Sequence, residues 1–124
     1  METTKRILIV DDEPNIVMSL EYLMRSKGLE VGIARSGTEA LEQMEQASYD
    51  LVLLDITMPD LDGYHVCKTI KAHPEWQKSH VVFLSAKSKQ SDIEKGMSLG
   101  ATDYIVKPFS TRDLSQRILD ILSQ

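Results

Sequence analysis

The chain has 124 residues, 42% of them hydrophobic and 27% charged, which fits one globular domain and excludes an intrinsically disordered chain. Its 14 Lys and Arg residues against 19 Asp and Glu residues give a formal net charge of -5, which disfavours nonspecific binding to nucleic acid phosphates. A single cysteine excludes an intrachain disulfide and a multi-cysteine zinc site, and no apolar run is long enough for a membrane span or a signal peptide, so we expect a cytoplasmic protein.

Five short strand-like segments alternate with five segments of helical periodicity along the chain. Three of the strand-like segments are uninterrupted apolar runs, typical of strands buried on both faces of a parallel sheet, whereas Glu30–Ala34 alternates like an edge strand. The predicted strands are Ile7–Val10, Glu30–Ala34, Leu51–Leu54, Val81–Leu84 and Tyr104–Val106. The predicted helices are Pro14–Lys27, Thr38–Gln46, Gly63–Ala72, Asp92–Leu99 and Thr111–Ser123.

Helix boundary signals agree with this division of the chain. Pro14 suits a first helical position, Gly28 and Gly100 suit positions just past a helix end, and Ser110 suits a cap. Strict alternation of strand and helix predicts right-handed crossovers and an α/β fold: a doubly wound five-stranded parallel sheet with helices on both faces. With no internal repeat or linker, residues 1–124 are expected to form one domain.

Polar residues follow the carboxyl ends of four predicted strands. Asp11 and Asp12 come after the first strand, Asp55 after the third, Ser85 after the fourth and Lys107 after the fifth. Each alone has an ordinary explanation as a helix cap or a turn residue. Because ligands bind at the carboxyl ends of the strands in open parallel sheets, complementary groups at all four ends favour a functional site.

The residue types at these ends point to phosphoryl chemistry on a metal. The carboxylates of Asp11, Asp12 and Asp55 repel one another unless a cation lies among them, and Mg²⁺ prefers oxygen ligands and keeps positions for phosphate oxygens. A carboxylate can attack phosphorus and form an aspartyl phosphate. Lys107 would neutralise the charge on the phosphoryl oxygens, and the Ser85 hydroxyl would donate a hydrogen bond to one of them.

The ordered set of motifs closely resembles the receiver domain of two-component response regulators. Besides the strand-end residues, the resemblance rests on Met58-Pro59, Asp62-Gly63, Ser85-Ala86 and the segment Tyr104-Ile105-Val106-Lys107-Pro108-Phe109, and it covers essentially the whole chain. It implies a flavodoxin-like fold with strand order 2-1-3-4-5.

The resemblance also implies a role for each residue around the acidic positions. Asp55 would be the phosphoacceptor, and Asp12, Asp55 and the backbone carbonyl of Thr57 would be direct Mg²⁺ ligands. Asp11 would bind the metal through water. Lys107 would pair with the phosphoryl group, and its peptide bond to Pro108 would be cis.

Two further implications concern signal output and the lifetime of the signal. Ser85 and Tyr104 would form a switch pair that changes the surface of the fourth helix, fifth strand and fifth helix. Thr57 and Lys87 lie where the hydrolysis rate is tuned in the family. Because neither is a carboxylate or amide that could position water, the sequence predicts a long-lived phosphoryl group.

The function implied is a signalling switch that takes its phosphoryl group from a phosphohistidine. Its partners would be a sensor histidine kinase or phosphotransfer protein and a downstream effector domain or target, and a phosphorylation-dependent homodimer is compatible with the sequence. The chain would catalyse only its own phosphorylation and dephosphorylation, so it is not expected to be an enzyme. We expect no contact with membrane or nucleic acid.

Two alternative functions remain open at this stage. One is an aspartate-nucleophile phosphatase or phosphotransferase, which resembles Asp-x-Asp with the second Asp as acid and base; here that position is Thr57. The other is a receiver-like interaction module that is never phosphorylated. The sequence names neither the cognate kinase nor the output, and it fits both a standalone receiver and a piece of a longer regulator.

Five residues outside the motifs are interpreted as structural. Cys67 is expected in the core because it shares a helical face with apolar residues. His65, His73 and His80 are expected in surface helices and loops, because no pair of them has metal-ligand spacing. Trp76 is expected to cover the end of the third helix.

Overall fold

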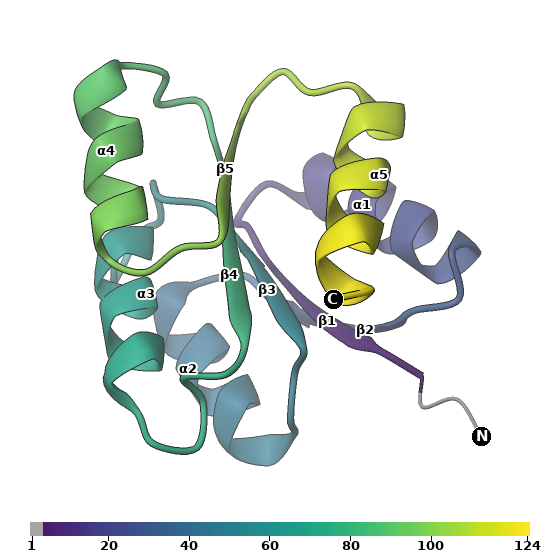
Figure 1. Ribbon diagram of the computed structural model, residues 1–124, viewed down its shortest axis with the longest axis horizontal. Coiled ribbons are helices and arrows are strands. Elements are labelled where there is room, and N and C mark those ends of the chain that lie inside the picture. Colours follow the sequence, from purple (N-terminus) through teal and green to yellow (C-terminus); the bar gives the residue numbers. More distant parts are fainter. Residues whose placement is uncertain (1–3) are drawn as a thin grey trace.

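The computed structural model describes residues 4–124, which form a parallel sheet between two layers of helices (Figure 1). The sheet has five strands in the order β2-β1-β3-β4-β5, so the predicted fold class and strand order are confirmed. The strands are β1 (Arg6–Val10), β2 (Glu30–Ala34), β3 (Leu51–Leu54), β4 (His80–Ser85) and β5 (Asp103–Val106).

The helices divide between the two faces of the sheet. One face carries α1 and α5, and the other carries α2, α3 and α4 (Figure 1). Their bounds are α1 (Pro14–Ser26), α2 (Gly37–Gln46), α3 (Gly63–Ala72), α4 (Gln90–Ser98) and α5 (Thr111–Leu122).

The predicted helices are present, with ends that differ by at most two residues. The largest difference is at α4, which begins at Gln90 instead of Asp92. The Asp92 carboxylate accepts a hydrogen bond from the Lys89 backbone N–H at 3.3 Å. Asp92 therefore lies within the first turn of α4 and caps the backbone N–H of the residue before the helix. The sequence pattern instead predicts Asp92 itself as the first residue.

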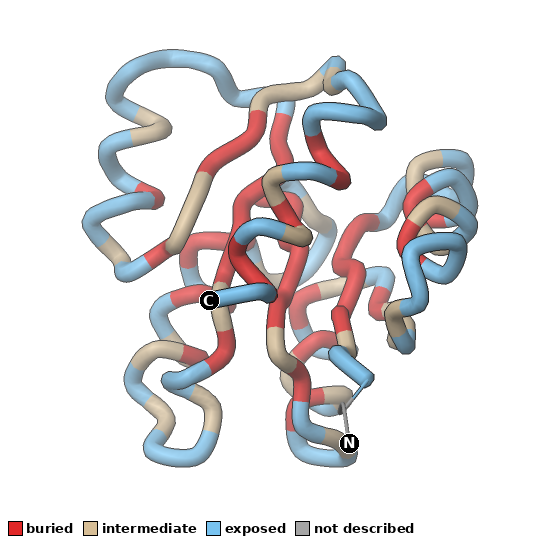
Figure 2. The backbone as a smooth tube through the Cα atoms, turned by 45° about the vertical axis from the view of Figure 1, so that its right-hand side comes forward, coloured by how far each residue is buried: buried red, intermediate tan, exposed pale blue. Residues whose placement is uncertain are grey.

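The central strands are buried on both sides, which explains their continuous apolar sequence. In β1, Ile7 and Ile9 pack in the layer under α1 and α5, whereas Leu8 and Val10 pack under α2, α3 and α4. Figure 2 shows these buried strands at the centre, with exposed residues on the outer helix faces and loops. Each fully buried Ile or Leu contributes roughly 1.5–3 kcal/mol relative to an exposed one.

The register of the sheet brings the carboxyl ends of the strands to one edge. Val10 of β1 lies beside Leu54 of β3, and Leu54 lies beside Phe83 of β4. Ser85, the last residue of β4, lies beside Val106 of β5. Residues that directly follow these positions therefore share one end of the molecule. β2 is an edge strand, as its alternation predicted.

Capping and glycine signals occupy their expected positions. Pro14 begins α1, and the Ser110 side chain accepts a hydrogen bond from the Asp113 N–H at 3.2 Å at the start of α5. Gly28 and Gly100 follow helices with φ values of 85° and 102°, a region that favours glycine.

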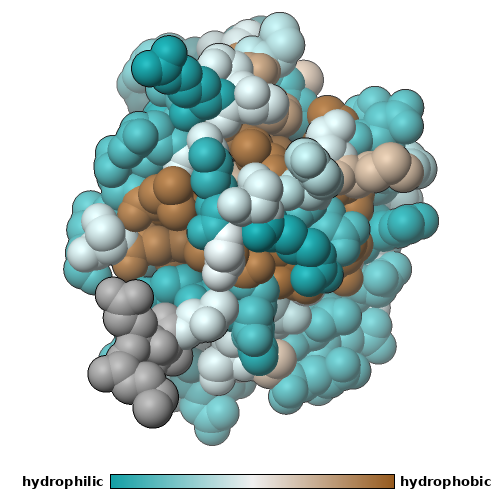
Figure 3. Space-filling view, turned by 90° about the vertical axis from the view of Figure 1, so that its right-hand side faces the viewer, coloured by the Kyte–Doolittle hydropathy of each residue, from teal (hydrophilic) through white to brown (hydrophobic). Residues whose placement is uncertain are grey.

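The face on which α1 and α5 lie shows how the helices cover the sheet from outside. On this face, patches of hydrophobic side chains are visible between hydrophilic ones (Figure 3). Partly buried residues such as Ile16, Leu23 and Phe109 pack there against the core. Among residues 4–124, no helix is long and apolar enough to cross a membrane.

The residues interpreted as structural are placed as expected with one exception. Cys67 is fully buried, and Trp76 stacks on His73 with ring centroids 3.7 Å apart, just past the end of α3. His65 is exposed on α3. The prediction of a helix or loop position is wrong for His80, which begins strand β4. His80 is half-buried, as is His73, and its Nδ1 lies 2.9 Å from the Thr102 hydroxyl.

Candidate phosphoacceptor site

Three carboxylates meet at the carboxyl ends of β1 and β3. Asp11 and Asp12 follow β1, Asp55 follows β3, and one oxygen from each lies within 4.8 Å of the others. Asp11 is 2% exposed and Asp55 is 7% exposed, whereas Asp12 faces solvent. The Asp11 Oδ1 also accepts the Glu13 N–H at 3.0 Å, which turns the chain into α1.

Lys107 reaches this cluster from the end of β5. Its Nζ lies 2.8 Å from Asp11 Oδ2 and 3.7 Å from Asp55 Oδ2, and its side chain is only 16% exposed. Its backbone N–H donates to the Ser85 carbonyl at 2.8 Å, and the following bond to Pro108 is cis. One partly buried ammonium group therefore lies between two buried carboxylates that follow different strands.

The protonation of Asp55 reflects opposing influences. Burial raises the pKa of Asp55 above its ordinary value, and the neighbouring Asp11 carboxylate adds to the rise. The Lys107 ammonium and the backbone N–H groups of Ile56 and Thr57 act in the opposite direction. The Ile56 N–H donates to Asp55 Oδ1 at 2.8 Å. The protein's own cation thus compensates only part of the negative charge.

The donor set of the cluster fits a hard divalent cation. Three carboxylates within 4.8 Å are opposed by one ammonium group, so positive charge is locally in deficit. Asp12 is exposed and lies beside the two buried members, which leaves the site open to solvent. An oxygen-rich, open site is the kind that Mg²⁺ prefers, because this ion keeps several of its waters.

The loop after Asp55 lies tightly against the site. The Gly63 N–H at the start of α3 donates to the Ile56 carbonyl at 2.8 Å. A Cβ at Gly63 would collide with the Asp55 carbonyl oxygen and lie 2.8 Å from the Ile56 Cα, so only glycine fits here. Thr57, between these anchors, is exposed.

Ser85 and Tyr104 share a backbone partner near the cluster. The Ser85 hydroxyl, in a residue 1% exposed, accepts the Lys87 N–H at 3.2 Å. The Tyr104 hydroxyl donates to the Lys87 carbonyl at 2.7 Å, and its ring lies 5.7 Å from that of Phe83. Tyr104 is 7% exposed, so its ring points inward.

Sequence reasoning did not find two features of this site. The Lys87 backbone, which contacts both Ser85 and Tyr104, carries no side-chain signal that could reveal it. Asp60 was given no role, yet its carboxylate accepts the backbone N–H groups of Gly37 and Thr38. Its position in a Pro- and Asp-rich loop was the available signal, but the partners are distant in sequence.

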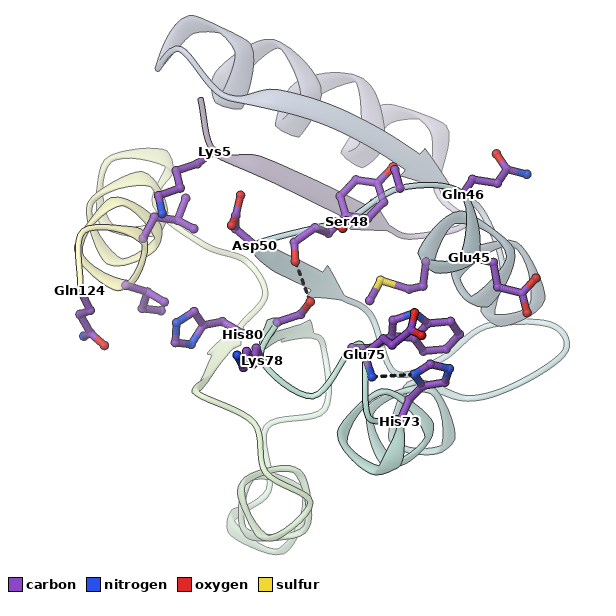
Figure 4. Close-up of a pocket in the computed structure, with 17 residues that line it drawn as sticks. Lys5, Glu45, Gln46, Ser48, Asp50, His73, Glu75, Lys78, His80 and Gln124 are labelled. Carbon is purple, nitrogen blue, oxygen red and sulfur yellow. Dashed lines mark hydrogen bonds between the residues drawn. The ribbon is translucent and has the colours of Figure 1, made fainter. Parts of the chain in front are cut away.

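A hollow of about 590 Å³, whose lining side chains are drawn in Figure 4, includes none of the three residues of the acidic cluster. It is bordered by residues next to the amino ends of strands, such as Lys5, Asp50 and His80, and by Gln124 near the end of α5. Its charged side chains have mixed signs. The hollow is therefore separate from the strand ends where the predicted site residues gather.

Comparison with known proteins agrees with the fold and identifies the family. Residues 7–119 match the model of the response regulator receiver domain. The chain is 41% identical over 118 residues to the alkaline phosphatase synthesis transcriptional regulatory protein PhoP of Bacillus subtilis, a match that covers 95% of this chain and 48% of PhoP. The chain belongs to the response regulator receiver family, and it is a signalling domain.

Two solved structures illustrate the likeness. A putative response regulator from Chloroflexus aurantiacus superposes with a TM-score of 0.92 at 35% identity, covering 98% of this chain and 100% of that one. The other is the receiver domain of the sensor histidine kinase PA1611 from Pseudomonas aeruginosa, which has a magnesium ion coordinated in its active site cleft. It superposes with a TM-score of 0.89 at 30% identity, covering 98% of this chain and 100% of that one. The chain spans about half the length of the curated relatives it matches.

Proposed function

We propose that this chain is a phosphoacceptor switch in which Asp55 takes a phosphoryl group from the phosphohistidine of a sensor histidine kinase or phosphotransfer protein. The observation that carries the proposal is the contact of Lys107 with both Asp11 and Asp55 at the carboxyl edge of the sheet. An ammonium held beside a nucleophilic carboxylate is placed to neutralise an incoming phosphoryl group.

Each residue of the site has a distinct task in the transfer. A carboxylate oxygen of Asp55 forms the new O–P bond while the P–N bond to the donor histidine breaks, so the phosphoryl group changes carrier without loss of atoms. Lys107 then exchanges part of its contact with Asp11 for a phosphoryl oxygen. The Ile56 N–H holds the orientation of the Asp55 carboxylate at 2.8 Å.

Magnesium is the proposed cofactor, held by Asp12, Asp55 and the Thr57 carbonyl directly and by Asp11 through water. The cluster of three carboxylates supports the assignment, as does the magnesium ion in the related receiver domain of PA1611. When bound, Mg²⁺ would neutralise charge on the phosphoryl oxygens.

The proposed output is a change in the surface formed by α4, β5 and α5. The Ser85 hydroxyl would leave the Lys87 N–H to donate to a phosphoryl oxygen, and Tyr104 would adjust because it is bonded to the same residue. This surface would report the state of Asp55 to an effector domain or target protein, and it would serve a phosphorylation-dependent homodimer. A cytoplasmic location fits such partners.

We further propose that residues 1–124 form one receiver domain, a slightly longer stretch than the matched range. Turnover as a phosphatase is not favoured, because Thr57 offers no acid or base two residues after Asp55. A module that is never phosphorylated is also not favoured, because the ion pair of Lys107 with the buried Asp11 would then have no reaction to serve.

Intact mass after incubation with acetyl phosphate tests the acceptor chemistry. We expect the wild-type chain to gain one phosphoryl group in the presence of Mg²⁺ and none after its removal by a chelator, because the carboxylates then lack a neutralising cation. Asp55→Asn is expected to gain none. Asp50→Asn, which alters a carboxylate bordering the hollow at the opposite edge, is expected to behave as wild type. A wild-type chain that gains no phosphate with Mg²⁺ would overturn the proposal.

A further inference from the structure

The loop between β3 and α3 is tied to a helix that takes no part in the proposed reaction. Asp60 lies in this loop, five residues after Asp55. Its Oδ1 accepts the Gly37 N–H at 2.9 Å, and its Oδ2 accepts the Thr38 N–H at 2.9 Å. Both partners belong to the first turn of α2, and they lie 23 and 22 residues away from Asp60 in sequence.

These contacts are additional to the local cap of α2. Ser36 already occupies the N-cap position, and its hydroxyl accepts the Glu39 N–H at 3.1 Å. Asp60 therefore binds the remaining amides of the first turn from outside the helix, where a carboxylate also complements the positive end of the helix dipole. The Thr38 hydroxyl, followed by nearby backbone N–H groups, holds the pKa of Asp60 below its ordinary value, so the carboxylate is charged at neutral pH.

The loop and the helix approach each other too closely for an ordinary side chain. A Cβ at Gly37 would lie 2.6 Å from the Leu61 Cβ and 2.7 Å from the Leu61 carbonyl oxygen, so glycine is needed where the loop crosses the helix. On the other side, the Gly63 N–H holds the Ile56 carbonyl at 2.8 Å. The segment between these anchors contains Thr57.

We infer that Asp60 is a positioning residue: its paired hydrogen bonds to the start of α2 hold the segment 56–61 in place and so fix the Thr57 backbone beside the Asp55 carboxylate. This inference rests on the proposed function for its consequence, because the Thr57 carbonyl is a proposed metal ligand. Outer contacts that orient metal ligands typically alter metal affinity by about 10- to 100-fold when they are removed.

The test compares two variants that each remove one capping group from the same end of α2. Asp60→Ala removes the contacts from the loop, whereas Ser36→Ala removes the local cap and leaves the loop bonds intact. We expect Asp60→Ala to raise the Kd for Mg²⁺, measured by titration calorimetry, by about 10-fold. Ser36→Ala is expected to keep the wild-type Kd, although it also weakens the helix.

A conservative variant and a second readout keep the test decisive. Asp60→Asn retains one acceptor oxygen, so we expect a smaller rise in the Kd than for Asp60→Ala, and this variant serves if the alanine variant does not fold. Amide hydrogen exchange at Ile56 and Gly63, whose N–H groups are hydrogen-bonded at the two ends of this segment, should be faster in either Asp60 variant than in Ser36→Ala. Equal Kd values and equal exchange in folded Asp60 and Ser36 variants would overturn the inference.

The same measurements separate this inference from the proposed function. If the wild-type chain gains no phosphoryl group from acetyl phosphate, the proposed function fails. Hydrogen exchange of the loop still judges the role of Asp60, because that readout needs neither metal nor phosphate. Faster exchange at Ile56 and Gly63 in the Asp60 variants supports the positioning role in that case, and unchanged exchange rejects it.

Discussion

Lys107 is the residue on which the electrostatics of the proposed site depend. Its ammonium group lies 2.8 Å from Asp11 and 3.7 Å from Asp55, while burial and Asp11 together raise the pKa of Asp55. A buried carboxylate pair without this cation would favour protonation of one member, which would weaken it as a nucleophile. The position of Lys107 at the end of an edge strand lets one side chain reach both.

Two exposed residues next to the site lead to a prediction about the lifetime of the phosphoryl group. Thr57 and Lys87 both face solvent, and neither carries a carboxylate or amide that could orient a water molecule for attack. We therefore expect the phosphorylated chain to persist for much longer than seconds, as followed by intact mass after removal of the phosphodonor.

A variant with a water-orienting group at position 57 provides a comparison for the phosphoryl lifetime of the wild-type chain. Thr57→Glu adds a carboxylate near Asp55, and we expect it to shorten the lifetime by about 100-fold or more, within the range for a positioned general base. Lys78→Gln, at the distant hollow, serves as a control for a change of charge alone. Decay of the wild-type phosphoryl group within seconds would show that the account of these two positions is wrong.

The predictability of individual residues depends on how far apart their partners lie. Asp11, Asp55 and Lys107 could be placed together from sequence, because parallel strands align their carboxyl ends. The hydrogen bonds of Asp60 to the start of α2 could not be predicted, because they join a side chain to backbone N–H groups more than twenty residues away. The inward ring of Tyr104 depends on the Lys87 carbonyl, which no sequence pattern reveals.

At the scale of elements, the edge strand β2 is covered by the Tyr49 side chain, which fits there because β2 has a glycine, Gly32, at that position. The Tyr49 ring lies against Gly32, where a Cβ would collide with the Tyr49 hydroxyl oxygen and lie 2.8 Å from Cζ. The Tyr49 hydroxyl in turn donates to Gln43 Oε1 of α2 at 3.0 Å. This arrangement connects β2, α2 and the start of β3 without a long side chain in the strand.

Gly32→Ala is therefore expected to destabilise the protein. In an open strand position, alanine would add roughly 0.5–1 kcal/mol of stability relative to glycine. Here Tyr49 must move and lose its bond to Gln43, so we expect a net loss of about 1–3 kcal/mol in the free energy of unfolding, measured with urea.

A double-mutant comparison assigns the cause of this loss. In the Tyr49→Leu background the smaller side chain leaves room for the added methyl group, so Gly32→Ala should cost much less there. An equal cost in both backgrounds would place the origin of the loss elsewhere than the Tyr49 ring.

Elements were more predictable than their ends. The five strands follow from short apolar runs because central parallel strands are buried on both faces. The start of α4 is predicted two residues late, because Asp92 caps the helix from the third position of its first turn and not from the position before the helix. His80 was placed in a loop because strand ends with polar residues lack the apolar pattern.

For the whole molecule, the alternation of strands and helices was sufficient to predict a doubly wound sheet, but not the order of its strands. Order 2-1-3-4-5 came from resemblance to the receiver family, since periodicity does not distinguish it from other parallel orders. The resulting molecule has two distinct ends. The carboxyl ends carry the acidic cluster, and the amino ends border the hollow of mixed charge.

The central claim is that Asp55 is the residue that carries the phosphoryl group. Borohydride reduces an acyl phosphate to the alcohol, so treatment of the phosphorylated chain followed by peptide mass mapping identifies the acceptor directly. The account predicts homoserine at position 55, formed only in the presence of Mg²⁺, with Asp11 and Asp12 unchanged. Reduction at another carboxylate, or a borohydride-resistant phosphate ester on Ser85, would contradict it.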